Sequence, residues 1–143
     1  MDRINRILGH PLFREKLNIL KEKEKDREFC LHNLDHLLAV CRYGYILILE
    51  NNIDIPKDIF YAAGLLHDLG RADESATEHH IRSARIAEQI LPDCGYDAQE
   101  IQKISAAIKS HREDPEKSDI LTLSDILYTA DKKTRNRPQR GRV

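Results

Sequence analysis

Several histidines and aspartates in this sequence fall where they could bind a metal ion together. His67 and Asp68 directly follow the apolar helical run "AAGLL", and His79 lies about three turns further along the chain. Imidazole nitrogens and carboxylate oxygens together suit Fe, Mn, Co, Ni or Zn, and they do not choose among these metals. The chemistry indicated is that of a transition-metal site.

Three further donors continue the apolar stripes of other predicted helices. Isoleucines at helical spacing lead to His111, apolar residues at the same spacing lead to Asp131, and His36 lies on the apolar face of its own helix. A single inward histidine is more often a hydrogen-bonded core residue than a ligand. Burying a carboxylate is costly unless a cation or several donors compensate. Together, these residues indicate a metal.

The elements that must position these side chains are helices. Helical periodicity and end signals predict helices over about 11–20, 30–51, 56–70, 78–91, 97–112 and 118–131, after a short N-terminal segment. Gly70 suits a left-handed C-terminal cap, and Asp97 with Glu100 forms a capping-box pattern. No strand or repeat is predicted. The fold class expected is all-α, a single-domain helical bundle of about six to seven helices.

Composition fits one soluble domain. The chain has 143 residues, of which 41% are hydrophobic and 33% charged, enough for a buried core. Three cysteines without C-x-x-C spacing suggest neither a disulfide framework nor a thiolate zinc site. No stretch approaches the ~20 apolar residues that span a bilayer, and no signal-peptide pattern is present. We expect a cytoplasmic protein that does not bind membranes.

Basic charge gathers at the C-terminus. Residues 132–143 hold six of the 23 basic residues and no acidic one. The aromatic side chains that stack on nucleic-acid bases are missing there. A solvated tail is therefore expected, and nucleic acid is not a favoured partner.

The ordered motifs resemble the HD superfamily of metal-dependent phosphohydrolases. "LLHDLGR" is preceded by a histidine about thirty residues upstream in "HNLDHLLAV" and followed by an aspartate in "LYTADK". The resemblance covers about residues 30–133. It leaves 1–29 as a helical segment packed on the domain and 134–143 as a basic tail, and it implies an all-helical fold.

The resemblance also implies roles for individual residues. His36 matches the first family histidine better than His32, and "HHIRSARIA" and "AIKSHR" resemble segments of HD proteins that bind two metals. The order of these histidines and aspartates along the chain resembles that in symmetrical diadenosine tetraphosphate hydrolases and in cyclic-dinucleotide phosphodiesterases. The first implied metal set is His36, His67, Asp68 and Asp131, and the second is Asp68, His79 and His111. His67 and Asp68 are the implied catalytic residues, with Asp68 bridging two divalent cations that generate a hydroxide for in-line phosphoryl displacement.

Departures from the family pattern concern the substrate and one helix contact. Arg71 stands where lysine is common, and its guanidinium could bind a phosphate in bidentate fashion. Lys132 and Arg135 are weaker candidates for the same role. Ser83 replaces a family glycine, which could alter how closely its helix packs.

We therefore expect a phosphomonoesterase or phosphodiesterase that uses two divalent transition-metal ions on a small phosphorylated substrate, with a nucleotide favoured. Three alternatives stay open: an HD-type diiron oxygenase, a one-metal nucleotidase and a nucleotide-binding module without turnover. A homodimer also stays open.

Overall fold

The structure of the chain is a computed structural model that describes residues 2–23, 33–72, 78–110 and 122–135. These residues form seven α-helices and two short 3-10 helices, and no strand occurs among them. The α-helices are α1 (Asp2–Gly9), α2 (Pro11–Lys23), α3 (Leu34–Glu50), α4 (Lys57–Leu66), α5 (His79–Ile90), α6 (Ala98–Ser110) and α7 (Leu123–Arg135), and the 3-10 helices are η1 (Leu69–Ala72) and η2 (Leu91–Cys94).

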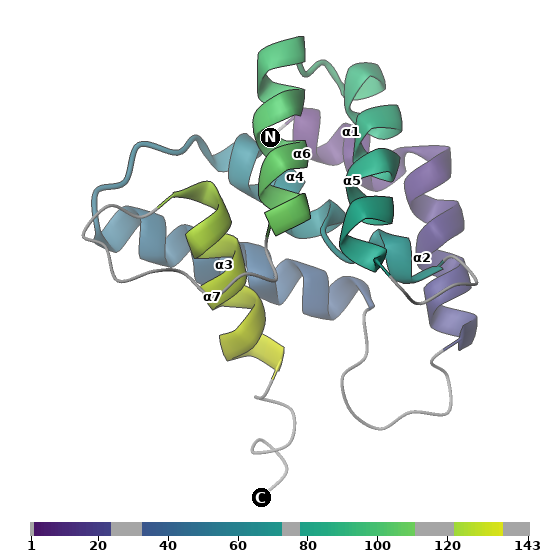
Figure 1. The fold of residues 1–143 in the computed structure, drawn as a ribbon, viewed down its shortest axis with the longest axis horizontal. Helices are drawn as coiled ribbons and strands as arrows, with labels where there is room; N and C mark the ends of the chain where they lie inside the picture. The colour runs from purple at the N-terminus through teal and green to yellow at the C-terminus, as the bar shows by residue number, and fades with distance from the viewer. Residues whose placement is uncertain (1, 24–32, 73–77, 111–121, 136–143) are drawn as a thin grey trace, which may run out of the picture.

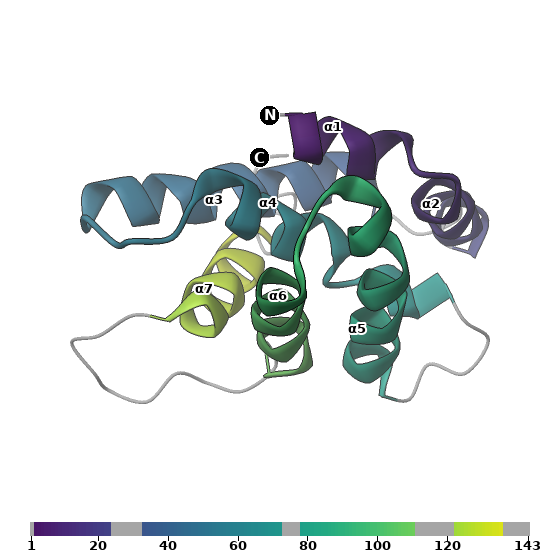
Figure 2. The ribbon, with the colours of Figure 1, turned by 90° about the horizontal axis from the view of Figure 1, so that it is seen from above.

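The helices surround one apolar core. α3 packs along α4, and α7, α6 and α5 lie in a row against this pair (Figures 1 and 2). α1 and α2 lie at the α5 side, where α2 packs against η1. This arrangement confirms the all-α single-domain prediction. None of the described helices combines the length and apolarity needed to cross a bilayer.

Local sequence signals explain several helix starts. The Asp97 carboxylate accepts from the Glu100 backbone N–H at 2.8 Å, and the Glu100 carboxylate accepts from Asp97 N–H at 3.0 Å, which confirms the predicted capping box. Thr122 and Asp125 make the same reciprocal pair before α7, which sequence reasoning missed. Asn33 begins α3, because its side-chain oxygen accepts from His36 N–H at 2.9 Å.

Two helix boundaries differ from the prediction. The helix predicted to run to Gly70 ends as an α-helix at Leu66 and continues into η1. Gly70 is not a left-handed cap, since Gly95 is the only glycine with positive φ in the described residues. α7 begins at Leu123 and runs four residues past Asp131, while residues 111–121, where the predicted start lies, fall outside the described part.

Glycine lets α3 and α4 approach closely enough to bring their functional residues together. A Cβ on Gly44 of α3 would lie 2.1 Å from the Phe60 ring of α4, and one on Gly64 of α4 would lie 2.6 Å from the Cys41 sulfur of α3. Phe60 and Cys41 are fully buried. Larger residues would push the two helices apart in a close-packed core.

The N-terminal helix is held by one arginine. Arg3 pairs with Glu100 at 2.6 Å and with Asp58 at 2.8 Å, and its guanidinium stacks 4.1 Å from the Tyr96 ring centroid. These contacts join α1 to α4 and α6. Such distant pairings are invisible to a reading of local sequence patterns.

Candidate metal centre

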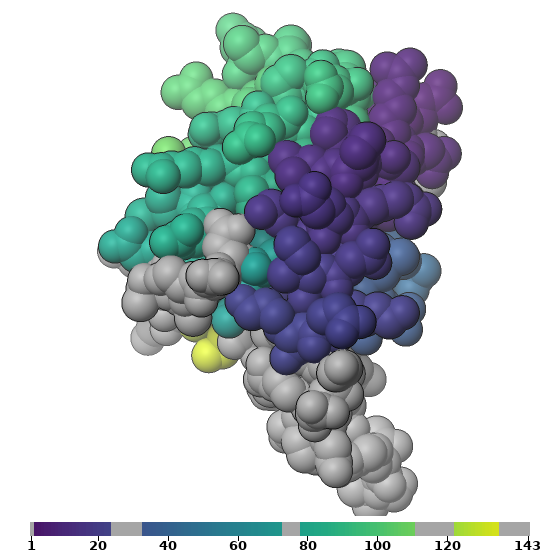
Figure 3. Space-filling view, turned by 90° about the vertical axis from the view of Figure 1, so that its right-hand side faces the viewer, coloured from purple at the N-terminus to yellow at the C-terminus, as the bar shows by residue number. Residues whose placement is uncertain are grey.

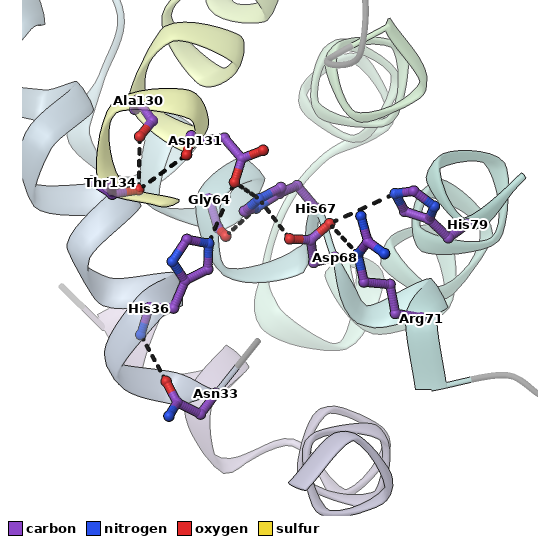
Figure 4. Close-up of polar contacts among 10 residues, drawn as sticks. All are labelled: Asn33, His36, Gly64, His67, Asp68, Arg71, His79, Ala130, Asp131 and Thr134. Carbon is purple, nitrogen blue, oxygen red and sulfur yellow. Dashed lines mark hydrogen bonds and ion pairs between the residues drawn. The ribbon is translucent and has the colours of Figure 1, made fainter. Parts of the chain in front are cut away.

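Four side chains from three parts of the fold meet in the core (Figure 4). They offer two imidazole nitrogens and two carboxylate oxygens that all lie within 4.8 Å of one another. His67 and Asp68 follow the end of α4, and both are fully buried. The quartet, as we call it below, is His36, His67, Asp68 and Asp131.

The ring orientation of His67 is fixed by the end of its own helix. Its Nδ1 donates to the Gly64 carbonyl at 2.7 Å, one of the C-terminal carbonyls of α4 that the helix itself leaves without a partner. The opposite nitrogen, Nε2, lies 3.2 Å from Asp68 Oδ2 and 3.3 Å from Asp131 Oδ1. A carbonyl acceptor on one ring nitrogen is the usual arrangement for a metal-binding histidine, because it turns the lone pair of the other nitrogen toward the ion.

Asp131 completes the quartet from α7. Its Oδ1 also lies 3.3 Å from Nε2 of His36, which α3 supplies. Burial alone would raise the pKa of Asp131, but the hydrogen bonds from His36 and His67 and the charge of His67 outweigh burial and hold this pKa well below its usual range. Asp131 therefore stays ionised inside the protein.

The raised pKa of His67 reflects the negative charge of the two aspartates around it. Burial lowers the pKa of His67, yet the charge of Asp68 and the hydrogen bonds that His67 donates to both aspartates outweigh burial and raise the pKa to about 10. Two buried carboxylates thus hold a proton on an imidazole that is ordinarily neutral at pH 7. The quartet attracts positive charge, and a divalent cation would supply more of it than one proton does.

Asp68 faces a second group of side chains through its other oxygen. Oδ1 lies 3.9 Å from Nε2 of His79 and 3.3 Å from Nε of Arg71 (Figure 4). His79 is buried at the first turn of α5. Asp68 therefore faces His67 with Oδ2 and His79 with Oδ1.

Contact between η1 and α5 sets the position of His79. The Gly70 backbone N–H donates to Ser83 Oγ at 2.7 Å, and both residues are buried. A Cβ on Gly70 would lie 2.2 Å from the His79 carbonyl oxygen. Only glycine permits this approach, and the Ser83 hydroxyl serves as the acceptor for the Gly70 N–H.

The remaining predicted residues have different outcomes. Lys132 is exposed and lies 5.6 Å over the Tyr128 ring, so nothing here brings it to the quartet. His111, His32 and the Arg135 side chain lie outside the described part of the chain. Sequence reasoning did not foresee the Arg71 contact with Asp68 or the role of the Ser83 hydroxyl, although the three-residue spacing of Asp68 and Arg71 could have indicated the first.

The donor set fits a transition-metal ion. Two imidazoles and two carboxylates suit Fe, Mn, Co, Ni or Zn, and the ring orientation of His67 and the excess negative charge both favour a cation. The residues that would hold it are the quartet.

Replacing Ser83 tests how η1 is held. Ser83→Ala leaves the buried Gly70 N–H without its acceptor, so we expect a loss of about 1–3 kcal/mol in the free energy of unfolding, measured in urea. Ser110→Ala is the matched control, since its partly exposed hydroxyl contacts helix carbonyls and Ser124; it should change stability by less than about 0.5 kcal/mol. Equal effects of the two substitutions would contradict this role for Ser83.

The pKa of His67 predicts a pH dependence of the metal-free protein. Folding raises this pKa from 6.5 to about 10, so the folded state binds the proton more tightly than the unfolded state. The stabilisation is complete below pH 6.5 and is lost as the pH rises toward about 10. Thermal melts in chelator should show the loss, and metal-loaded protein should lose less because the cation replaces the proton. Chelated protein that gains stability over this range would refute the assignment.

Comparison with known proteins supports the fold. The HD domain family model matches residues 33–136, a range that holds every quartet residue. An uncharacterised protein of Clostridium beijerinckii is 38% identical over 137 residues, which cover 94% of this chain and 85% of that protein. A second, from Methanocaldococcus jannaschii, is 33% identical over 89 residues, covering 59% of this chain and 47% of that protein.

A solved structure shows the same architecture. The crystal structure of a predicted HD superfamily hydrolase from an uncultured Thermotogales bacterium superposes with a TM-score of 0.61 at 31% sequence identity. The match covers 85% of this chain and 67% of the other. With the family model, the helical fold and a His/Asp cluster able to hold a metal all in agreement, this chain belongs to the HD domain family and has the fold of an HD superfamily hydrolase.

Proposed function

We propose that the protein is a metal-dependent phosphohydrolase that cleaves a small phosphoester, with a nucleotide as the favoured substrate class. The observation that carries the proposal is the buried quartet, in which the carboxylates of Asp68 and Asp131 lie beside the proton-holding imidazole of His67. Such a set is costly to bury without a cation. A divalent cation bound there would polarise a phosphoryl oxygen and lower the pKa of bound water.

The quartet residues and Gly64 have separate proposed roles in holding the cation. His36 and His67 would each offer Nε2 to a bound cation, and Asp68 and Asp131 would supply the negative charge that holds it. The Gly64 carbonyl keeps the His67 ring oriented with Nε2 facing the carboxylates. The site is shielded from bulk solvent on the α4 side, since His67 and Asp68 are fully buried, and low polarity strengthens each of these interactions.

Arg71 is the proposed contact for the phosphate. Its Nε lies 3.3 Å from Asp68 Oδ1, which places the guanidinium beside the quartet, and its side chain is 29% exposed. A guanidinium carries further N–H groups that can donate to phosphate oxygens. Anchoring by Asp68 would reduce the conformational entropy that Arg71 loses when the substrate binds.

A second cation is proposed on the other side of Asp68, where His79 is a ligand candidate. The support is the division of the two Asp68 oxygens between His67 and His79. The contact of Arg71 with the same oxygen favours the alternative of one metal, with the guanidinium providing the second positive charge. His111, the other expected ligand, lies outside the described residues.

Removing one quartet carboxylate tests the proposed function. Asp131→Asn should lose bound metal and reduce phosphoesterase activity by at least about 100-fold, since it removes a ligand charge. The measurements are metal content of the purified protein and a screen of phosphomonoesters, phosphodiesters and dinucleotides with several divalent ions. The matched control is Asp35→Asn, an exposed first-turn residue of α3, which should retain both properties.

Two outcomes of this screen would overturn the proposal. One is wild-type protein that holds metal in the quartet but hydrolyses no phosphoester with any ion. The other is Asp131→Asn with full activity. Oxygen consumption by an iron-loaded protein would instead favour the oxygenase class.

The metal stoichiometry of His79→Ala distinguishes one bound cation from two. If two cations bind, His79→Ala should lower the bound metal from about two equivalents to about one and weaken activity, because a ligand of the second ion is lost. His80→Ala, the adjacent histidine, should retain the wild-type stoichiometry. Wild-type protein that saturates at a single equivalent, unchanged by His79→Ala, establishes the one-metal reading.

A further inference from the structure

A basic groove runs between α2 and α5, and none of the quartet residues lines it. α2 and α5 each pack against η1 and have little backbone contact with each other, so η1 holds them apart. Figure 3 views the molecule from the side where these two helices lie next to each other. The hollow between them has a volume of about 220 Å³ and is lined by Leu12, Lys16, Arg82, Arg85, Ile86 and Gln89. We call it the α2–α5 groove.

The charged side chains that line this groove are all basic. Lys16 comes from α2, and Arg82 and Arg85 come from α5, so cations face the hollow from both walls. Among the described residues that line it, none is acidic. Concave surfaces with cations of one sign and apolar walls focus the electrostatic field on an anion more strongly than a flat surface does.

Apolar and amide groups complete the lining. Ile86 is buried and Leu12 is half-buried, so they form a low-polarity floor beneath the cations. Gln89 adds an amide that can donate a hydrogen bond. At about 30 Å³ for each water of the liquid, the hollow has room for a phosphate group with part of its hydration shell. Arginine is well suited to binding phosphate because its planar guanidinium can donate two hydrogen bonds to phosphate oxygens.

One end of the groove, at Arg82, lies beside η1. Arg82 lies one helical turn after His79, about 4.5 Å along the axis at 1.5 Å per residue. A Cβ on Gly70 would lie 2.8 Å from Arg82 Cβ, which shows how closely Arg82 adjoins the 3-10 helix that follows Asp68. η1 is also held to α2, because Lys23 Nζ donates to the Arg71 carbonyl at 3.0 Å.

We propose that the α2–α5 groove binds a phosphate group other than the one that is hydrolysed. Its source is either a distal phosphate of a substrate that carries several phosphates or a free phosphate anion. The first source rests on the proposed function, whereas binding in the groove does not. If the first source holds, the substrate class is an oligophosphate such as a nucleoside triphosphate.

Binding to metal-free protein tests the site independently of catalysis. The full chain in chelator is titrated calorimetrically with sodium tripolyphosphate and, separately, with orthophosphate. Arg82→Gln/Arg85→Gln should weaken tripolyphosphate binding at least about tenfold through lost charge-assisted hydrogen bonds. The matched control is Arg14→Gln/Arg42→Gln, two exposed arginines outside the groove, which removes the same charge and should bind like wild type. Thermal melts establish that each variant is folded.

Kinetics with metal-loaded protein then separate the two sources. A fall of about tenfold in the ratio of kcat/KM for a nucleoside triphosphate to that for the monophosphate, in Arg82→Gln/Arg85→Gln, identifies a distal phosphate of the substrate. An unchanged ratio with lost tripolyphosphate binding identifies a free anion. If no substrate is hydrolysed, the proposed function fails while the binding result still decides the groove.

Three results would overturn the groove proposal. Wild-type protein that binds neither anion at millimolar concentration is the first. Equal tripolyphosphate affinity in the groove variant and its matched control is the second. The third is tighter binding of a polyglutamate peptide than of tripolyphosphate, which would point to an acidic protein partner.

Discussion

Two carboxylates buried beside one imidazole are the constraint on which the rest of this structure depends. Asp68 and Asp131 lie in an apolar core where an isolated negative charge is strongly disfavoured. The fold compensates by turning His67 toward both of them and by raising its pKa to about 10. A core of this size gains nothing in stability from such a cluster that apolar residues could not supply. Its presence is therefore best explained by a ligand with positive charge.

The helices are arranged so that this cluster forms at their junction. α4 ends one residue before His67, whose ring then bonds back to the helix through Gly64. α3 lies against α4 because glycines on both helices allow close approach. η1 then turns the chain so that Gly70 meets α5, which brings His79 to the far side of Asp68. Backbone packing thus determines the spacing of the donors.

Much of this could be predicted from the sequence, because the signals are local. Inward positions of His36 and Asp131 follow from helical periodicity, and the Asp97 capping box follows from two residues three apart. The prediction of a left-handed cap at Gly70 was wrong, because this glycine instead allows close contact with α5, which no local pattern reveals. Neither the Arg3 network nor the α2–α5 groove was foreseen, because both join residues distant in sequence. The place of His111 stays a prediction.

Anomalous diffraction from crystals of metal-loaded protein is the most direct test of the central claim. Data collected at the absorption edge of the added metal should give a difference peak bounded by Nε2 of His36 and His67 and by carboxylate oxygens of Asp68 and Asp131. The opposite result is a folded, metal-saturated crystal with no peak among these four side chains. In that case the buried carboxylates would need another source of positive charge.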